Sequence, residues 1–279
     1  MKSSVKIILK YLLLFIESML VILIALIATF KFTLFNKDYV KNEFEKNNYY
    51  EKLAEEIKTE MSYYTNQSGF TDEVLDGIFT EEEVRYDFES FINSLYTGQE
   101  FTINTKDLEN NLNKRINAEL KNSNFKITNS EEIKKFVKQM ATVYDNEIRL
   151  MNYIDSVKGI LSKVVNMCDK VLFVLSMVLI ICVLTSISAF RGKDLSVVSY
   201  TSSFLLLFFV LYVINSIDIN HISIYSELVS SIIKALVKNV LNIIKIVSCL
   251  LLGLGLIIDI LRKERRRHRH HHRSSSEEV

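Results

Sequence analysis

An uninterrupted apolar stretch from Tyr11 to Phe30 constrains this chain more than any other feature of its sequence. It reads YLLLFIESMLVILIALIATF and contains a single charged residue, Glu17. About 20 apolar residues are what an α-helix needs to cross ~30 Å of hydrocarbon. The stretch is longer than the apolar core of a cleaved signal peptide, and no A-x-A cleavage motif follows it. We therefore expect an uncleaved membrane anchor.

Three more apolar stretches follow later in the chain. They cover Val171–Phe190, Leu195–Ile217 and about Leu241–Leu261. The sequence contains no proline and only 7 glycines, so little in it interrupts helical conformation. These features predict an all-α membrane protein with four transmembrane helices. The domains expected are 1–36 (N-terminus and first span), 37–167 (a mainly helical extracytoplasmic domain), 168–261 (spans two to four) and 262–279 (a basic tail).

The distribution of charge predicts which ends face the cytoplasm. Lys2, Lys6 and Lys10 precede the first span, and residues 262–273 carry seven basic side chains against one acidic side chain. Residues 37–165 instead carry 17 basic and 24 acidic side chains, a net charge of −7. Cytoplasmic segments of membrane proteins are enriched in Lys and Arg. We therefore expect a multi-pass protein of the cell membrane with both termini in the cytoplasm.

Helical periodicity dominates the segment between the first two spans. Apolar residues at helical spacing predict helices over 38–66, 80–96 and 106–121, and a further helix that begins at Ser130. Thr80 and Glu83 have the spacing of a capping box, and Gly69 and Gly98 are placed to end helices. The helix from Ser130 either continues into the second span or breaks near Asp145 or Gly159.

Two short stretches alternate apolar and polar residues, as strands do. Glu100–Asn104 and Phe125–Ile127 are the two stretches, and we expect them to pair as a small two-stranded ribbon. Leu228–Val240 is amphipathic, which is typical of a helix lying in the membrane interface.

Composition argues against several classes of function. The acidic charge of residues 37–165 argues against nucleic-acid binding, because phosphate contacts need a basic surface. All three cysteines lie outside that segment, so we expect it to contain no disulfide. No Walker motif, HExxH, nucleophile elbow or selectivity-filter sequence is present. No cofactor is expected.

Polar residues inside the spans are the first candidate site. Glu17 lies about 9 Å from the inner end of the first span at 1.5 Å per residue, and a carboxylate at that depth is costly unless it is paired, protonated or hydrated. Polar residues at a similar depth on the other spans include Thr185, Ser202 and Asp259. These residues form either a polar pocket with a function or hydrogen bonds that hold the helices together.

Histidines are the second candidate. His221 is the one histidine outside the tail, and Asp218 or Glu227 is placed to orient it as a general base, although no nucleophile is evident. The tail RKERRRHRHHHR is expected to attract anionic lipid. Metal binding by the tail is a weaker expectation, which concerns His268, His270, His271 and His272.

Parts of this sequence resemble two groups of known membrane proteins. FNKDYVKNEFEKNNYYEKL and QSGFTDEVLDGIFTEEEVRYDFESFINSLYTGQEFTINTKDL resemble segments of uncharacterised bacterial four-span membrane proteins with a helical extracytoplasmic domain. That resemblance covers about residues 35–110 and implies an architecture. The four spans and the stretch Met151–Lys158 are more remotely similar to the lipoprotein intramolecular transacylases. That family uses outward-facing histidines, and residues 37–167 contain none.

The leading hypothesis is therefore a non-enzymatic envelope protein whose extracytoplasmic domain binds or senses a protein or another envelope ligand. One alternative is a membrane enzyme that handles lipid or lipoprotein acyl chains. The other is a transporter or pore component built around Glu17.

Overall fold

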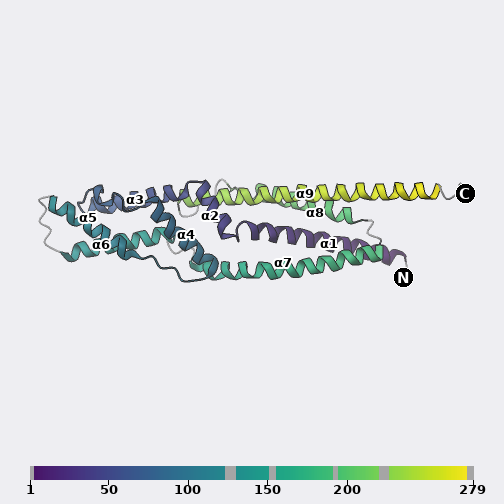
Figure 1. Ribbon diagram of the computed structural model, residues 1–279, viewed down its shortest axis with the longest axis horizontal. Coiled ribbons are helices and arrows are strands. Elements are labelled where there is room, and N and C mark those ends of the chain that lie inside the picture. The colour runs from purple at the N-terminus through teal and green to yellow at the C-terminus, as the bar shows by residue number, and fades with distance from the viewer. Residues whose placement is uncertain (1–2, 123–129, 151–154, 191–193, 220–225, 275–279) are drawn as a thin grey trace. The chain divides into compact units, whose positions relative to one another are not determined.

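The computed structural model describes residues 3–122, 130–150, 155–190, 194–219 and 226–274, and these residues form helices and connecting segments without a β-strand (Figure 1). The elements in chain order are α1 (Ser3–Phe32), α2 (Lys37–Lys46), α3 (Tyr49–Gln67), the 3-10 helix η1 (Asp72–Leu75), α4 (Glu81–Thr97), α5 (Thr105–Asn122), α6 (Ser130–Ile148), α7 (Asp155–Phe190), α8 (Leu195–Ser216) and α9 (Glu227–Ser274). They divide into two compact units. The first comprises Met1–Leu34, Asn166–Ile222 and Leu236–Val279, and the second comprises Phe35–Val165 and Ser223–Ala235.

Four of the described helices are long and apolar enough to cross a membrane. The apolar segments are Ser4–Phe32, Gly159–Phe190, Leu195–Ser216 and Glu227–Glu264. By length and composition, they confirm the four spans predicted from the sequence. The chain is therefore a multi-pass membrane protein.

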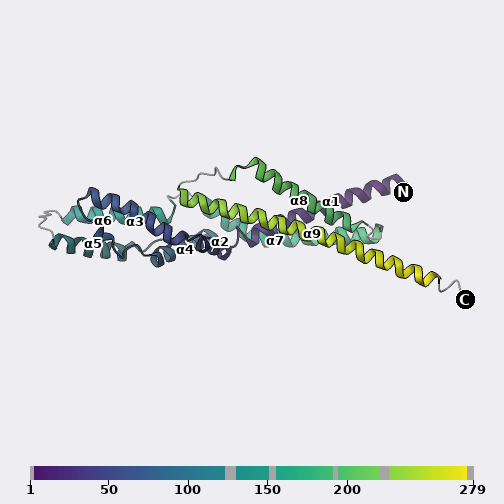
Figure 2. The same ribbon diagram turned by 90° about the horizontal axis from the view of Figure 1, so that it is seen from above.

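The first unit has an apolar core to which α1, α8 and α9 contribute. α1 packs directly against α8 (Figures 1 and 2). Leu206 and Val210 of α8 are buried together with Leu241 and Ile244 of α9, and Ile22 and Leu26 of α1 lie against this cluster. α1, α8 and α9 lack the polar face that a soluble amphipathic helix has, because lipid rather than water surrounds helices that span a membrane.

α7 is far less covered than the other spans. Phe173, Ile181 and Leu184 are at least 60% exposed within the unit. The polar contacts that join α7 to α1 include an ion pair between Lys31 and Asp169 and a hydrogen bond from Ser186 to Glu17. Apolar side chains that point outward on a spanning helix face the lipid.

The second unit is a bundle of amphipathic helices with its own core. Aromatic rings form the centre of one end, where Phe88 of α4 is fully buried and lies 5.1 Å from Phe44 and 5.0 Å from Tyr49 between ring centroids. The fully buried aliphatic side chains include Ile57, Met61, Leu112, Ile116, Met140 and Ile148. The helical spacing in the sequence predicts this burial, since residues three and four apart share one face.

Local signals at the ends of α4 are confirmed. Thr80 Oγ1 accepts a hydrogen bond from the Glu83 amide at 3.3 Å, and Glu83 Oε2 accepts one from the Thr80 amide at 3.5 Å, which completes the predicted capping box. Gly98 ends the helix with φ +74°, a left-handed conformation that favours glycine.

The single helix expected over 38–66 is instead two helices. α2 ends at Lys46 and α3 begins at Tyr49, and Asn48 between them has φ +52°. Asparagine tolerates this left-handed conformation better than most residues. The turn lets Phe44 of α2 and Tyr49 of α3 pack against each other, with ring centroids 4.7 Å apart. Both rings also pack against Phe88 of α4, so tertiary packing favours the break.

The first of the two stretches expected to pair as a ribbon, Glu100–Asn104, is not a strand. Residues 100–104 have no regular secondary structure, and Phe125–Ile127 lies outside the described residues. Arg149 contacts this segment, since its Nη2 donates to the Phe101 carbonyl at 2.9 Å. Its guanidinium also lies 5.0 Å from the centroid of the Phe101 ring. A side chain therefore occupies a backbone acceptor that a strand would have used.

Two other helix boundaries in the structure concern segments for which the sequence leaves alternatives open or predicts something different. α6 ends at Ile148 and Leu150 has φ +51°, so the helix from Ser130 stops three residues after Asp145, whereas Gly159 lies inside α7. α9 runs unbroken through Leu228–Val240, and its 48 residues extend for about 72 Å at 1.5 Å per residue (Figure 1). A separate helix in the interface is therefore not present.

Candidate functional site

Glu17 is fully buried in the first unit. Its Oε1 accepts a hydrogen bond of 2.6 Å from the hydroxyl of Ser186 on α7, and its Oε2 is buried without a hydrogen-bond partner in the described part of the chain. No ion pair joins Glu17 to a basic side chain among the described residues. An isolated carboxylate in the membrane interior is costly by about 2.5–3.5 kcal/mol or more. The site is therefore suited to binding a proton or a small cation.

Ser186, rather than Thr185, is the residue that reaches Glu17. Thr185 is exposed, and its hydroxyl donates to the carbonyl of Ile181 on its own helix at 2.8 Å. Consecutive residues of a helix point about 100° apart, so only one of this pair can face α1. The sequence places both residues at a similar depth but does not reveal which of them faces inward.

Ser202 lies at the contact between α8 and α1. It is fully buried, and its hydroxyl donates to the backbone carbonyl of Ser18 at 3.2 Å. Ser18 in turn donates to the Leu14 carbonyl of its own helix at 2.9 Å. Small hydroxyl side chains let two helix backbones approach closely in a membrane. The contact of Ser202 is therefore one that holds helices together.

A reciprocal pair of serines joins α8 to α9. Ser203 Oγ donates to the Ser248 carbonyl at 2.8 Å, and Ser248 Oγ donates to the Ser203 carbonyl at 2.7 Å. Ser248 was not singled out from the sequence. Its position within an uncharged run of α9 is the signal that points to it, since a lone hydroxyl in such a run needs a partner.

Asp259 contacts α8 rather than Glu17. Its Oδ2 accepts a hydrogen bond of 3.0 Å from the hydroxyl of Tyr200, and Arg262 lies 3.8 Å away on the next turn of α9. Gly255 makes room for this contact, because a Cβ at that position would lie 2.6 Å from a ring carbon of Tyr200. The two intramembrane carboxyl groups therefore have different hydrogen-bond partners.

A groove of about 660 Å³ lies in the second unit between α4, α5 and α6. Its acidic lining residues are Glu82, Glu83, Asp87 and Asp107, and none of its lining residues in the described part of the chain is Lys or Arg. The hydroxyl of Tyr144 donates to Asp87 at 2.8 Å. Burial is the largest cause of the raised pKa of Asp87, the hydrogen bond from Tyr144 opposes the shift, and the charge of Glu83 adds to it. The groove therefore concentrates four carboxyl groups in one place.

The histidine hypotheses gain no geometric support. His221 lies outside the described residues, whereas Asp218 follows α8 and Glu227 is the first residue of α9, and both are exposed. Among the described residues, no group of three or more His, Cys, Asp or Glu is arranged to hold a metal ion. The side chains of His268, His270, His271 and His272 are not described.

No family model, curated protein or solved structure matches this chain.

Proposed function

We propose that this chain is a non-enzymatic integral membrane protein of the bacterial cell envelope whose extracytoplasmic domain, residues 37–167, binds a partner through a basic surface of that partner. The single observation that carries the proposal is the acidic groove between α4, α5 and α6. Four carboxylates line it, together with the apolar side chains Ile78, Ile103 and Leu108. A groove that combines apolar and acidic lining fits a segment with basic and apolar side chains.

The electrostatics of the groove support a cationic occupant. The raised pKa of Asp87 comes chiefly from burial and also from the neighbouring charge of Glu83, and an incoming ammonium or guanidinium group would oppose this shift by stabilising the charged carboxylate. The net charge of −7 over residues 37–165 extends the same field beyond the groove. The positive-inside rule assigns the chain's own basic segments, 262–273 and Lys2–Lys10, to the side of the membrane opposite the extracytoplasmic domain.

Site-specific photo-cross-linking in cells tests the proposal. A photoreactive residue replaces Tyr86, which is 74% exposed and lines the groove, and in a matched control it replaces Tyr63 of α3, which is 59% exposed and lies outside it. We expect a discrete adduct from position 86 and none from position 63. The double variant E82Q/D107N should weaken the adduct, and so should added salt, since screening shortens the reach of surface charges. Equal labelling at both positions, or an adduct that ignores the double variant, would contradict a role for the groove.

A second candidate function is transport or pore formation around Glu17. The observation that favours it is the buried Oε2 of Glu17, which has no partner in the described part of the chain. Flux of protons and monovalent cations into proteoliposomes tests it, with E17Q as the variant that keeps the side-chain shape. Absence of flux in the wild type, or equal flux in E17Q, would exclude it.

A further inference from the structure

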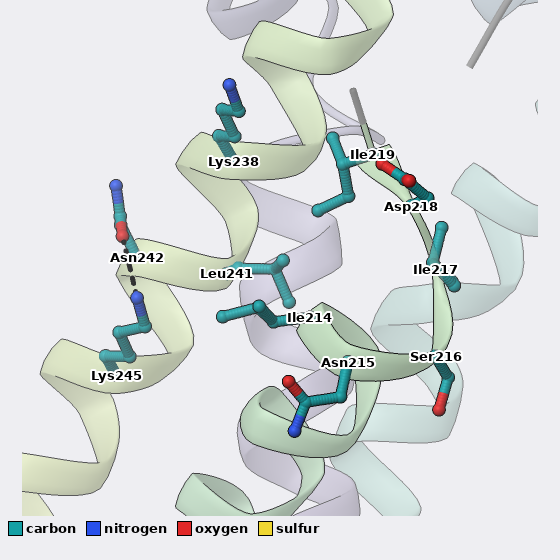
Figure 3. Close-up of a pocket in the computed structure, with 10 residues that line it drawn as sticks. All are labelled: Ile214, Asn215, Ser216, Ile217, Asp218, Ile219, Lys238, Leu241, Asn242 and Lys245. Atoms are coloured by element: carbon teal, nitrogen blue, oxygen red, sulfur yellow. Dashed lines mark hydrogen bonds between the residues drawn. The ribbon is translucent and has the colours of Figure 1, made fainter. Parts of the chain in front are cut away.

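The end of α8 and the N-terminal half of α9 border a pocket of about 640 Å³ (Figure 3). One wall consists of Ile214 and the segment that follows α8, including Ile217 and Ile219. α9 forms the other wall. Figure 3 shows Ile214 and Leu241 extending into the space between the two helices. The floor of the pocket is therefore apolar, and it belongs to neither of the sites described above.

Two lysines occupy the same face of α9 beside this apolar floor. Lys238 and Lys245 are seven residues apart, which places them on one side of the helix and about 10 Å apart along its axis. Asn242 lies between them, and Lys245 Nζ donates to its Oδ1 at 3.4 Å (Figure 3). Neither lysine forms an ion pair in the described part of the chain. Two cations and an amide therefore line the pocket, together with one carboxylate, that of Asp218.

The pocket lies beside the end of the α8 span. The apolar span of α8 ends at Ser216, and Ile219 just beyond it is still buried against Leu241 and Ile244 of α9. After Lys245, α9 has no charged residue from 246 to 258. Lysines at the end of a span extend their ammonium groups toward the interface and leave the stems in contact with acyl chains.

We propose that this pocket binds the headgroup of an anionic phospholipid, phosphatidylglycerol. Lys238, Asn242 and Lys245 bind the phosphodiester, and an acyl chain runs along Ile214 and Leu241. Asp218, which also lines the pocket, is placed to accept hydrogen bonds from the hydroxyls of the glycerol headgroup. A free phosphate would leave the apolar floor exposed, whereas a lipid covers it.

This site differs from the expected contact of the basic tail with lipid, because Lys238 and the tail lie toward opposite ends of α9. The leaflet that supplies the lipid is therefore the one opposite the tail. The proposal is independent of the acidic groove and of Glu17, so its failure would leave both proposed functions untouched.

The full chain in nanodiscs of equal parts phosphatidylglycerol and phosphatidylcholine provides the test. A benzophenone side chain replaces Ile217, which follows α8, lines the pocket and is 49% exposed, or in a control Leu211 of α8, which lies outside the pocket and is 58% exposed. Mass spectrometry identifies the lipid adducts. We expect phosphatidylglycerol to be enriched at position 217 relative to position 211, by about fivefold for each lysine that contacts it.

Variants then separate the site from general charge attraction. K238Q/K245Q should abolish the enrichment, and K238R/K245R should keep it. The control K134Q/K135Q removes two exposed charges from α6 and should also keep it. Equal adduct ratios at positions 217 and 211, or enrichment that survives K238Q/K245Q, would overturn the proposal. Displacement of the lipid by soluble glycerol 3-phosphate would also overturn it, since the pocket would then take the free phosphate.

Discussion

The hydroxyl of Ser186 on α7 donates a 2.6 Å hydrogen bond to the carboxyl group of Glu17 on α1, across 169 positions of sequence. Only one other contact, the ion pair of Lys31 with Asp169, is a polar link between these two helices in the described part of the chain. The packing of α7 onto α1 therefore depends on very few side chains.

The Glu17–Ser186 bond should be measurable as an energetic coupling. We expect E17A and S186A each to destabilise the protein, and the double variant to cost less than the sum, with a coupling free energy of about 0.6–2 kcal/mol. Unfolding by sodium dodecyl sulfate in mixed micelles measures it. S188A on the same exposed stretch of α7 serves as the control, and strictly additive effects of E17A and S186A would show that the bond contributes nothing.

Two glycines of α9 should respond in opposite directions to alanine. G255A places a Cβ 2.6 Å from the Tyr200 ring, so we expect the ring to move, its hydrogen bond to Asp259 to break and stability to fall by about 1–3 kcal/mol. G253A meets nothing within 4 Å and should be neutral or stabilising by up to about 1 kcal/mol, because alanine is the better helix former. Thermal unfolding in detergent distinguishes them. Equal effects of the two substitutions would contradict the close contact with Tyr200.

The stability of the second unit should depend on pH through Asp87. Its pKa in the folded state is raised above the ordinary value of 3.8, chiefly by burial, so the folded state binds the proton more tightly than the unfolded chain does. Stability is therefore highest below that value and falls as pH rises through the raised pKa. We expect D87N, whose amide oxygen still accepts from Tyr144, to flatten this fall and to be more stable than the wild type at pH 7.

Thermal unfolding of the full chain, followed by circular dichroism from about pH 3 to about pH 8, measures the fall. E73Q removes an exposed carboxylate outside the groove and serves as the control. A D87N profile that keeps the wild-type slope would show that another group is responsible.

Arg149 should hold the segment after α4 in place. Its Nε lies 2.9 Å from both carboxylate oxygens of Asp145, and its Nη2 donates to the Phe101 carbonyl at 2.9 Å. We expect R149A to cost about 1.5–3 kcal/mol, the range for hydrogen bonds of charged groups. Hydrogen exchange should then speed up over residues 99–104 while α3 stays protected. R149K keeps the charge but not the planar geometry, so a fully protected segment in R149K would indicate that charge alone suffices.

Local features of the second unit were predictable because they depend on residues close in sequence. The capping box at Thr80 and the end of α4 at Gly98 follow from side chains and backbone conformations within a few positions. The same holds for α5, which runs from Thr105 to Asn122 and was expected over 106–121. The break at Asn48 was not predictable in this way, since a helical pattern of apolar residues runs across it and both Phe44 and Tyr49 pack against Phe88, which lies about forty positions further along the chain.

The sequence by itself determined that this is a helical membrane protein with four spans, because apolar length and composition depend on no partner. Only the tertiary structure decided which polar groups meet: Ser186 rather than Thr185 at Glu17, Tyr200 at Asp259, and Lys238 with Lys245 beside the end of α8. The reason is that a span is apolar on nearly every side. Its rotation about its own axis is therefore set by packing against neighbouring helices, which the sequence of one helix does not contain.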